Sequence, residues 1–140
     1  MAEYTEDQMY PKTIMYTHGL IKGAQAGPIV GAGIGTFWAL YKRSPIPILR
    51  GATIGLITAP AVTCAMIYGR MMSKEDIEWK DRAWRLQRNN GQLLVDRYSL
   101  LTMASAVPLA VLLRMPILQS MAIGSTVGVA CYSLTTSFNK

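Results

Sequence analysis

The chain alternates between long apolar stretches and short charged segments. Four stretches contain no Asp, Glu, Lys or Arg: residues 23–41, 51–69, 98–113 and 115–138. A helix that crosses the hydrocarbon core of a bilayer needs about 20 mainly apolar residues, within a range of roughly 17–25. The third stretch is slightly short, but Arg114 directly after it can extend its charge toward the lipid headgroups. The pattern predicts an all-α membrane protein, one domain over residues 1–140, with four transmembrane helices.

A further helix is predicted over residues 74–88, in the charged segment between the second and third apolar stretches. Three acid–base pairs stand there at i, i+4 spacing in the favourable order: Asp76–Lys80, Glu78–Arg82 and Asp81–Arg85. Ser73 and Asp76 have the spacing of a capping box, and Gly91 suits a left-handed cap at the far end. We therefore expect a charged surface helix between the second and third spans.

Aromatic residues give this surface helix two alternative roles. Trp79 and Trp84 are of the type that anchors a protein at the membrane–water interface. Together with Arg85 they are also typical of residues that anchor a protein–protein contact. Both roles stay open at this point.

Glycines recur at every fourth residue of the first apolar segment: Gly19, Gly23, Gly27, Gly31 and Gly35. Four residues are about one helical turn, so these glycines form one stripe on one helix. Each would cost ~1 kcal/mol relative to alanine in a water-soluble helix. In a bilayer such a stripe lets another helix approach backbone to backbone.

Later glycines extend this pattern of close packing. Gly51 and Gly55 lie in the second stretch, and Gly124 and Gly128 lie in the fourth. We expect these glycines to meet the first span within one bundle. The stripe of the first span is nevertheless longer than one internal crossing should require. We therefore also expect a helix from another subunit to pack on it.

The two halves of the chain share a short internal repeat. Residues 47–55 align without gaps with residues 116–124, with five of the nine positions identical. Both segments lead into an apolar stretch, the second and the fourth. The match indicates duplication of a two-helix unit, with both copies in the same orientation.

Composition adds no sign of catalysis. The 140 residues carry a formal net charge of +6, and 51% of them are apolar. The basic residues flank the apolar stretches, as is typical of membrane proteins, and no soluble face presents a patch for nucleic acid. The single histidine, His18, has no second histidine or nearby carboxylate in the sequence with which to bind a metal. We expect no enzyme activity, metal, cofactor, nucleic acid or small-molecule substrate.

Polar residues near and within the spans have two further predicted roles. Four basic residues at span ends are expected to contact lipid phosphate: Lys42, Arg43, Arg50 and Arg114. The spans themselves contain no ionisable side chain, which argues against a proton pathway through them. Their small hydroxyl residues either line a wet groove or bond to helix backbone: Thr36, Thr53, Thr58, Thr63, Ser125 and Thr126.

On these residues the chain resembles the mitochondrial inner-membrane translocase superfamily. The resemblance rests on four short spans, the glycine stripe of the first span, and a basic turn formed by residues 42–45 and 50–51. That superfamily includes channel-forming translocase subunits, a chloroplast outer-envelope amino-acid pore and an accessory membrane subunit of respiratory complex I. The length and the charged helix over residues 74–88 are most similar to the accessory subunit.

The resemblance implies a function and a location. It implies a non-catalytic, multi-pass subunit of the mitochondrial inner membrane that stabilises the membrane arm of complex I (NADH:ubiquinone oxidoreductase). The implied partners are other membrane subunits of a large complex and membrane lipid such as cardiolipin. The alternative is a protein-translocation or solute-channel subunit of a mitochondrial or plastid membrane.

Overall fold

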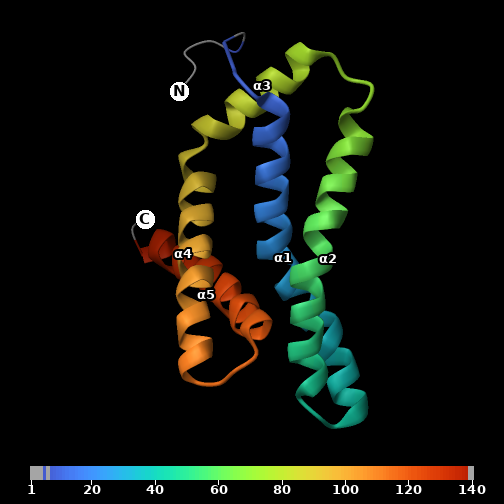
Figure 1. The fold of residues 1–140 in the computed structure, drawn as a ribbon, viewed down its shortest axis with the longest axis vertical. Helices are drawn as coiled ribbons and strands as arrows, with labels where there is room; N and C mark the ends of the chain where they lie inside the picture. The colour runs from blue at the N-terminus through green and yellow to red at the C-terminus, as the bar shows by residue number, and fades with distance from the viewer. Residues whose placement is uncertain (1–4, 6, 139–140) are drawn as a thin grey trace.

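The computed structural model describes residue 5 and residues 7–138, and this part of the chain forms five α-helices. They are α1 (Pro11–Lys42), α2 (Ile46–Met71), α3 (Asp76–Arg88), α4 (Asn90–Leu112) and α5 (Ile117–Phe138). Helices α1 and α2 pack as one antiparallel hairpin, and α4 and α5 pack as another. The two hairpin turns lie at one end of the molecule and α3 lies at the other (Figure 1). The predicted all-helical fold is confirmed, including the helix between the second and third stretches.

Three of the helices in residues 7–138 are long and apolar enough to cross a membrane. They are α2, α4 and α5. Helix α1 is not among them, so the structure supports three of the four predicted spans by length and composition. The physical reason is that glycines contribute no apolar side chain, and that the first turns of α1 contain Lys12, His18 and Lys22. Helix α1 is also much longer than residues 23–41, since it begins at Pro11.

The junction between α3 and α4 differs from the predicted one. The residue before α3 is Glu75, and no side chain caps this helix, so the predicted capping box of Ser73 and Asp76 does not form. Helix α4 begins directly after Asn89, whose side-chain oxygen accepts a hydrogen bond from the backbone N–H of Gln92 at 3.2 Å. Gly91 therefore lies in the first turn of α4 and is not a left-handed cap. A side-chain cap at Asn89 starts the next helix at once.

The two hairpin turns contain arginines in an unusual backbone conformation. Arg43 follows α1 with φ of 50°, and Arg114 follows α4 with φ of 52°. Left-handed backbone is unfavourable for a residue with a side chain, because Cβ crowds the following carbonyl. Both turns nevertheless reverse the chain within a few residues. Arg43 of the predicted basic turn and Arg114, which was predicted to contact lipid phosphate, are therefore both turn residues.

Helix α5 joins the two hairpins. It contacts α1 and α2 as well as its own partner α4. The hydroxyl of Ser125 donates a hydrogen bond to the carbonyl of Ala24 in α1 at 2.8 Å. Ser125 and Ser99 of α4 are both fully buried, so a polar contact ties the two halves at the centre of the bundle.

Most large apolar side chains face outward. In α2 only Leu56 and Met71 are buried, while residues such as Ile54, Val62 and Met66 are exposed. Outward-facing apolar side chains are the arrangement that a bilayer favours, since lipid surrounds the helices there. The buried residues are mainly glycines, alanines and serines, together with a few polar groups and four larger residues, Pro28, Leu56, Met71 and Trp79.

Candidate functional site

The glycine stripe of α1 lies against α2 along its whole length. A Cβ added at Gly27 would overlap the Gly55 carbonyl, and one added at Gly31 would overlap the Gly51 carbonyl. The other three stripe residues meet α2 as well: Gly19 at Ile67, Gly23 at Ala59 and Pro60, and Gly35 at Pro47 and Ile48. Because the helices are antiparallel, each successive glycine of α1 contacts a residue about one helical turn earlier in α2. Backbone approaches backbone, as in small-xxx-small helix packing.

This contact corrects the prediction that the stripe of α1 needs a helix from another subunit. Two helices that cross at a steep angle separate within a few turns, so one helix of the same chain was not expected to contact all five glycines. Helix α2 instead presents small or compact residues at the matching four-residue spacing: Pro47, Gly51, Gly55, Ala59 and Thr63. The Thr63 hydroxyl donates a hydrogen bond to the Gly19 carbonyl at 2.7 Å, near the far end of the contact.

The glycines of α5 have a different partner from the predicted one. A Cβ at Gly124 would meet the backbone of Thr102 and Met103 in α4, and one at Gly128 would overlap the Thr102 hydroxyl. They therefore close the α4–α5 hairpin and do not meet α1. Each half of the chain uses glycines of its second long helix to close its own hairpin, which agrees with the internal repeat.

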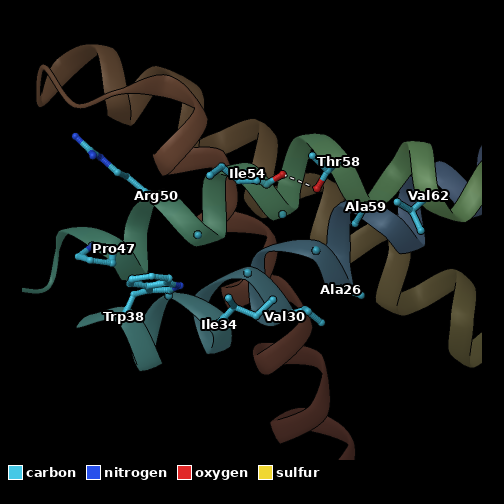
Figure 2. Close-up of a pocket in the computed structure, with 15 residues that line it drawn as sticks. Ala26, Val30, Ile34, Trp38, Pro47, Arg50, Ile54, Thr58, Ala59 and Val62 are labelled. Carbon is cyan, nitrogen blue, oxygen red and sulfur yellow. Dashed lines mark hydrogen bonds between the residues drawn. The ribbon is translucent and has the colours of Figure 1, made fainter. Parts of the chain in front are cut away.

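An apolar groove of about 470 Å³ runs along the outer side of the α1–α2 contact. Its floor is the glycine backbone, and its walls include Val30 and Ile34 from α1 and Ile54 and Val62 from α2 (Figure 2). Groove formation follows from the absence of side chains on the floor. Arg50 stands at one end of the groove and extends away from these wall residues (Figure 2).

The hydroxyl residues in and beside the spans satisfy helix backbone. Thr58 donates to the Ile54 carbonyl at 2.9 Å (Figure 2) and Thr53 donates to the Leu49 carbonyl at 2.9 Å. The remaining hydroxyls do the same: Thr36 to Ala32, Thr63 to Pro60 and Gly19, Thr126 to Ala122 and Ser125 to Ala24. Backbone bonding, one of the two alternatives left open by the sequence, is therefore present at all six residues.

A cluster of polar side chains lies between α1 and α4, at the α3 end of the molecule. Asp96 of α4 is 7% exposed and sits at its centre. Its Oδ1 atom lies 2.7 Å from Lys22 Nζ and accepts a hydrogen bond from Gln25 Nε2 at 2.8 Å. Its Oδ2 atom lies 3.3 Å from His18 Nδ1. Lys22 Nζ also donates to Gln25 Oε1 at 3.1 Å, so the four side chains form one network.

This environment favours the neutral form of His18. Burial lowers the pKa of His18, Asp96 acts in the opposite direction, and Lys22 adds to the lowering. His18 lies before residue 23, where the predicted first span begins. His18 Nδ1 lies 3.3 Å from Asp96 Oδ2, so a neutral ring that carries its proton on Nδ1 can donate it to the carboxylate.

His18 has a partner that the sequence pattern did not predict. No carboxylate stands near His18 in the sequence, but Asp96, which is far away in the chain, lies beside it in the structure. A signal was present: His18, Lys22 and Gln25 stand at i, i+4 and i+7, so they share one face of α1. Three polar residues on one face of an otherwise apolar helix require a polar partner. That partner could not be located without the packing of α4 on α1.

Helix α3 packs against α1 and places Trp79 differently from either predicted role. Trp79 is 5% exposed and packs on Tyr16, with ring centroids 6.0 Å apart. Lys12 Nζ lies 5.7 Å from the Trp79 ring centroid and 3.6 Å from Asp76 Oδ1. Trp79 is therefore an internal contact between α3 and α1, and not an anchor exposed to lipid or to a partner.

The two other predicted anchors are partly accessible. Trp84 is half-buried, and the Arg88 guanidinium lies 4.2 Å from its ring centroid. Arg85 is exposed and its Nε lies 3.0 Å from Asp81 Oδ2, as the i, i+4 spacing predicts. Glu78 was predicted to pair with Arg82. Its Oε1 atom lies 3.2 Å from Lys74 Nζ instead.

The four predicted lipid-phosphate residues are not one site. Lys42 and Arg43 end α1, Arg50 lies in the first turns of α2, and Arg114 lies in the other hairpin turn. All four are exposed and lie toward the hairpin-turn end of the molecule. Within residues 7–138 no group of three or more His, Cys, Asp or Glu side chains is arranged to hold a metal ion.

One of the comparisons with known proteins assigns the chain to a family. No curated protein and no solved structure matches the chain. A family model matches residues 47–137, from the first turn of α2 to the last turn of α5. The chain therefore belongs to the family described as Protein of unknown function (DUF1757).

Proposed function

We propose that this protein is a non-catalytic structural subunit of a respiratory membrane complex of the mitochondrial inner membrane, with complex I as that complex. In this proposal it stabilises the membrane arm by packing against large membrane subunits. The observation that carries the proposal is the combination of a closed, glycine-packed interior with an outward-facing apolar surface. A closely packed helical bundle with an apolar outer surface suits a position between lipid and larger membrane subunits.

The proposal includes a membrane-embedded α1. Helix α1 lies antiparallel to α2 with its backbone against the backbone of α2 from Gly19 to Gly35. Helix α2 is long and apolar enough to cross a bilayer. A helix bound this closely to a membrane-crossing partner shares its depth, which supports a fourth span over residues 23–41.

Support for a non-catalytic role comes from the chemistry of the buried cluster. Asp96 is surrounded by Lys22, Gln25 and His18, and each of its oxygens already has a polar partner. A carboxylate that is paired in this way stabilises helix packing and is poorly placed to accept a further proton or a substrate. In this proposal the cluster holds the two hairpins together through its ion pair and hydrogen bonds between α1 and α4.

The second candidate function is a translocation or solute channel. It would require the hydroxyls of Thr53, Thr58 and Thr63 to face water. Each of them donates its hydroxyl proton to a backbone carbonyl, and the groove beside Thr58 is lined mainly by apolar side chains, which favours the structural role. Accessibility of cysteines placed at these three positions to an aqueous thiol reagent tests the channel, and uniform protection counts against it.

Depletion of the protein followed by native gel electrophoresis tests the structural role. The proposal expects loss of assembled complex I, accumulation of membrane-arm fragments and loss of NADH:ubiquinone activity. Re-expression of the unchanged chain should restore all three. Fully assembled and active complex I after complete depletion would overturn the proposal.

A further inference from the structure

A second cavity, of about 580 Å³, lies between α1, α2 and α3. Helix α3 crosses the ends of the long helices away from the hairpin turns (Figure 1), and the lining residues Arg82 and Arg85 of α3 place the cavity at that end. We call it the basic cavity, because four of its lining residues are cationic: Lys22, Arg70, Arg82 and Arg85. Among the described residues, none that lines this cavity carries a carboxylate.

Two of these four charges are neutralised within the chain. Lys22 pairs with Asp96 at 2.7 Å, and Arg85 pairs with Asp81 at 3.0 Å. Arg70 and Arg82 make no ion pair with any described residue. The basic cavity thus has an excess of positive charge from two arginines that belong to different helices.

The nearest acids on α3 do not compensate Arg82. Arg82 lines a shallow hollow with Glu78 and Asp81, but Glu78 is bound by Lys74 and Asp81 by Arg85. A guanidinium without a carboxylate partner retains its full capacity for bidentate hydrogen bonds to a phosphate.

The other half of the basic cavity is apolar. Its lining includes Met15, Met66, Ile67 and Leu86. Arg70 follows directly on the apolar stretch 51–69, so it stands where a membrane-crossing helix reaches the headgroup level. Met66 and Ile67 lie about one turn deeper. A ligand that suits this cavity has an anionic group at headgroup depth and an apolar chain below it.

One buried polar atom of the cavity lining also lacks a partner. The side-chain oxygen of Gln92 is buried and has no hydrogen-bond partner among the described residues. An unpaired buried polar group is unfavourable unless a ligand or water satisfies it. The hydroxyl groups of a phosphoglycerol headgroup are donors of the required kind.

We propose that the basic cavity binds one anionic phospholipid, with its phosphate between Arg70 and Arg82 and an acyl chain against Met66 and Ile67. Basic pockets between membrane helices are suited to such headgroups. This site is separate from the basic residues of the hairpin turns. The proposal rests on membrane insertion of the chain and does not depend on which complex the chain joins.

Native mass spectrometry of the full chain in mild detergent tests the site. The chain is mixed with dioleoyl phosphatidylglycerol or with dioleoyl phosphatidylcholine, and bound lipid is counted. We expect one phosphatidylglycerol retained in preference to phosphatidylcholine. The double variant Arg70→Gln, Arg82→Gln should weaken this retention by roughly 10- to 30-fold, since each basic side chain contributes about 1 kcal/mol to such binding. The matched control is Arg97→Gln, at an exposed residue of α4 outside the cavity lining, and should change retention less than about twofold.

Two further measurements keep the test decisive. The charge-conserving variant Arg70→Lys, Arg82→Lys should retain phosphatidylglycerol at least partly, which separates loss of charge from loss of fold. Inorganic phosphate at millimolar concentration should displace little of the bound lipid, because phosphate lacks the acyl chain. Equal retention of the two lipids, an unchanged double Gln variant, or full displacement by inorganic phosphate would each overturn the proposal.

Discussion

Gly31 of α1 and Gly51 of α2 lie backbone to backbone, so that a Cβ on either residue would overlap the carbonyl oxygen of the other. Gly27 and Gly55 have the same reciprocal relationship one turn away. These contacts leave no space for a side chain between the two helices. The α1–α2 hairpin therefore depends on glycine at these positions through packing, and not through backbone flexibility.

Replacing Gly31 by alanine should destabilise the protein by roughly 2 kcal/mol, because the added methyl group meets backbone that cannot move without separating the helices. Gly33 is the matched control, since a Cβ there has no atom within 4 Å. Gly33→Ala should be neutral or stabilising by up to about 1 kcal/mol. Unfolding of the detergent-solubilised variants by a denaturing detergent measures both free energies. Equal effects of the two substitutions would contradict the packing described here.

Asp96→Asn should destabilise the protein by about 2–3 kcal/mol, because Lys22 would lose its counter-charge in a largely buried position. Replacing both partners, as Lys22→Met with Asp96→Leu, should cost less than the sum of the two single changes. A double-mutant cycle on the free energy of unfolding measures this coupling. Strict additivity would show that the 2.7 Å contact does not hold α1 to α4.

Acidification should weaken the folded state through His18. The pKa of His18 is lowered from its ordinary value of 6.5, chiefly by burial, so the unfolded chain binds this proton more readily than the folded chain. The stabilising contribution is complete above pH 6.5 and is lost as the pH falls below that value. His18→Gln should remove this dependence between pH 6.5 and about 5, a range above most carboxylate pKa values. Unfolding free energies of both proteins across this range provide the test. A decline of the same size in His18→Gln would assign the effect to another group.

The features that were predictable from sequence are those encoded within single segments. Apolar stretches and the four-residue spacing of glycines were enough to predict helices and close helix contacts, and the charged pairs were enough to predict α3. The Asp81–Arg85 ion pair forms as its i, i+4 spacing predicts. The partner of the glycine stripe was harder to predict. Three of the α2 residues that match it, Pro47, Ala59 and Thr63, are compact but are not glycine, so a search for glycine spacing does not find them.

Contacts between distant segments were not predictable. Asp96 stands in the charged segment before the third apolar stretch, but α4 begins at Asn90 and carries Asp96 into the bundle beside His18. Trp79 has the residue type of an interfacial anchor, but α3 folds back on α1 and buries it. In both cases the fold that brings the two helices together overrides the preference of the single residue.

Trp79→Ala should cost about 3 kcal/mol of stability, since a buried indole would leave a cavity between α3 and α1. Trp38 is 55% exposed and serves as the comparison. Trp38→Ala should change the free energy of unfolding by less than about 1 kcal/mol. Thermal or denaturant unfolding followed by far-ultraviolet circular dichroism reports on both. A larger loss for Trp38→Ala than for Trp79→Ala would contradict the docking of α3 on α1.

The most direct test of the proposed structural role is the identity of the complex that contains this chain. A tagged copy can be isolated from mitochondrial membranes in mild detergent, with the stoichiometry of co-purifying proteins determined by quantitative mass spectrometry. The proposal predicts membrane-arm subunits of complex I in amounts equal to the tagged chain. Recovery with a protein-translocation complex, or with no large complex, would contradict it.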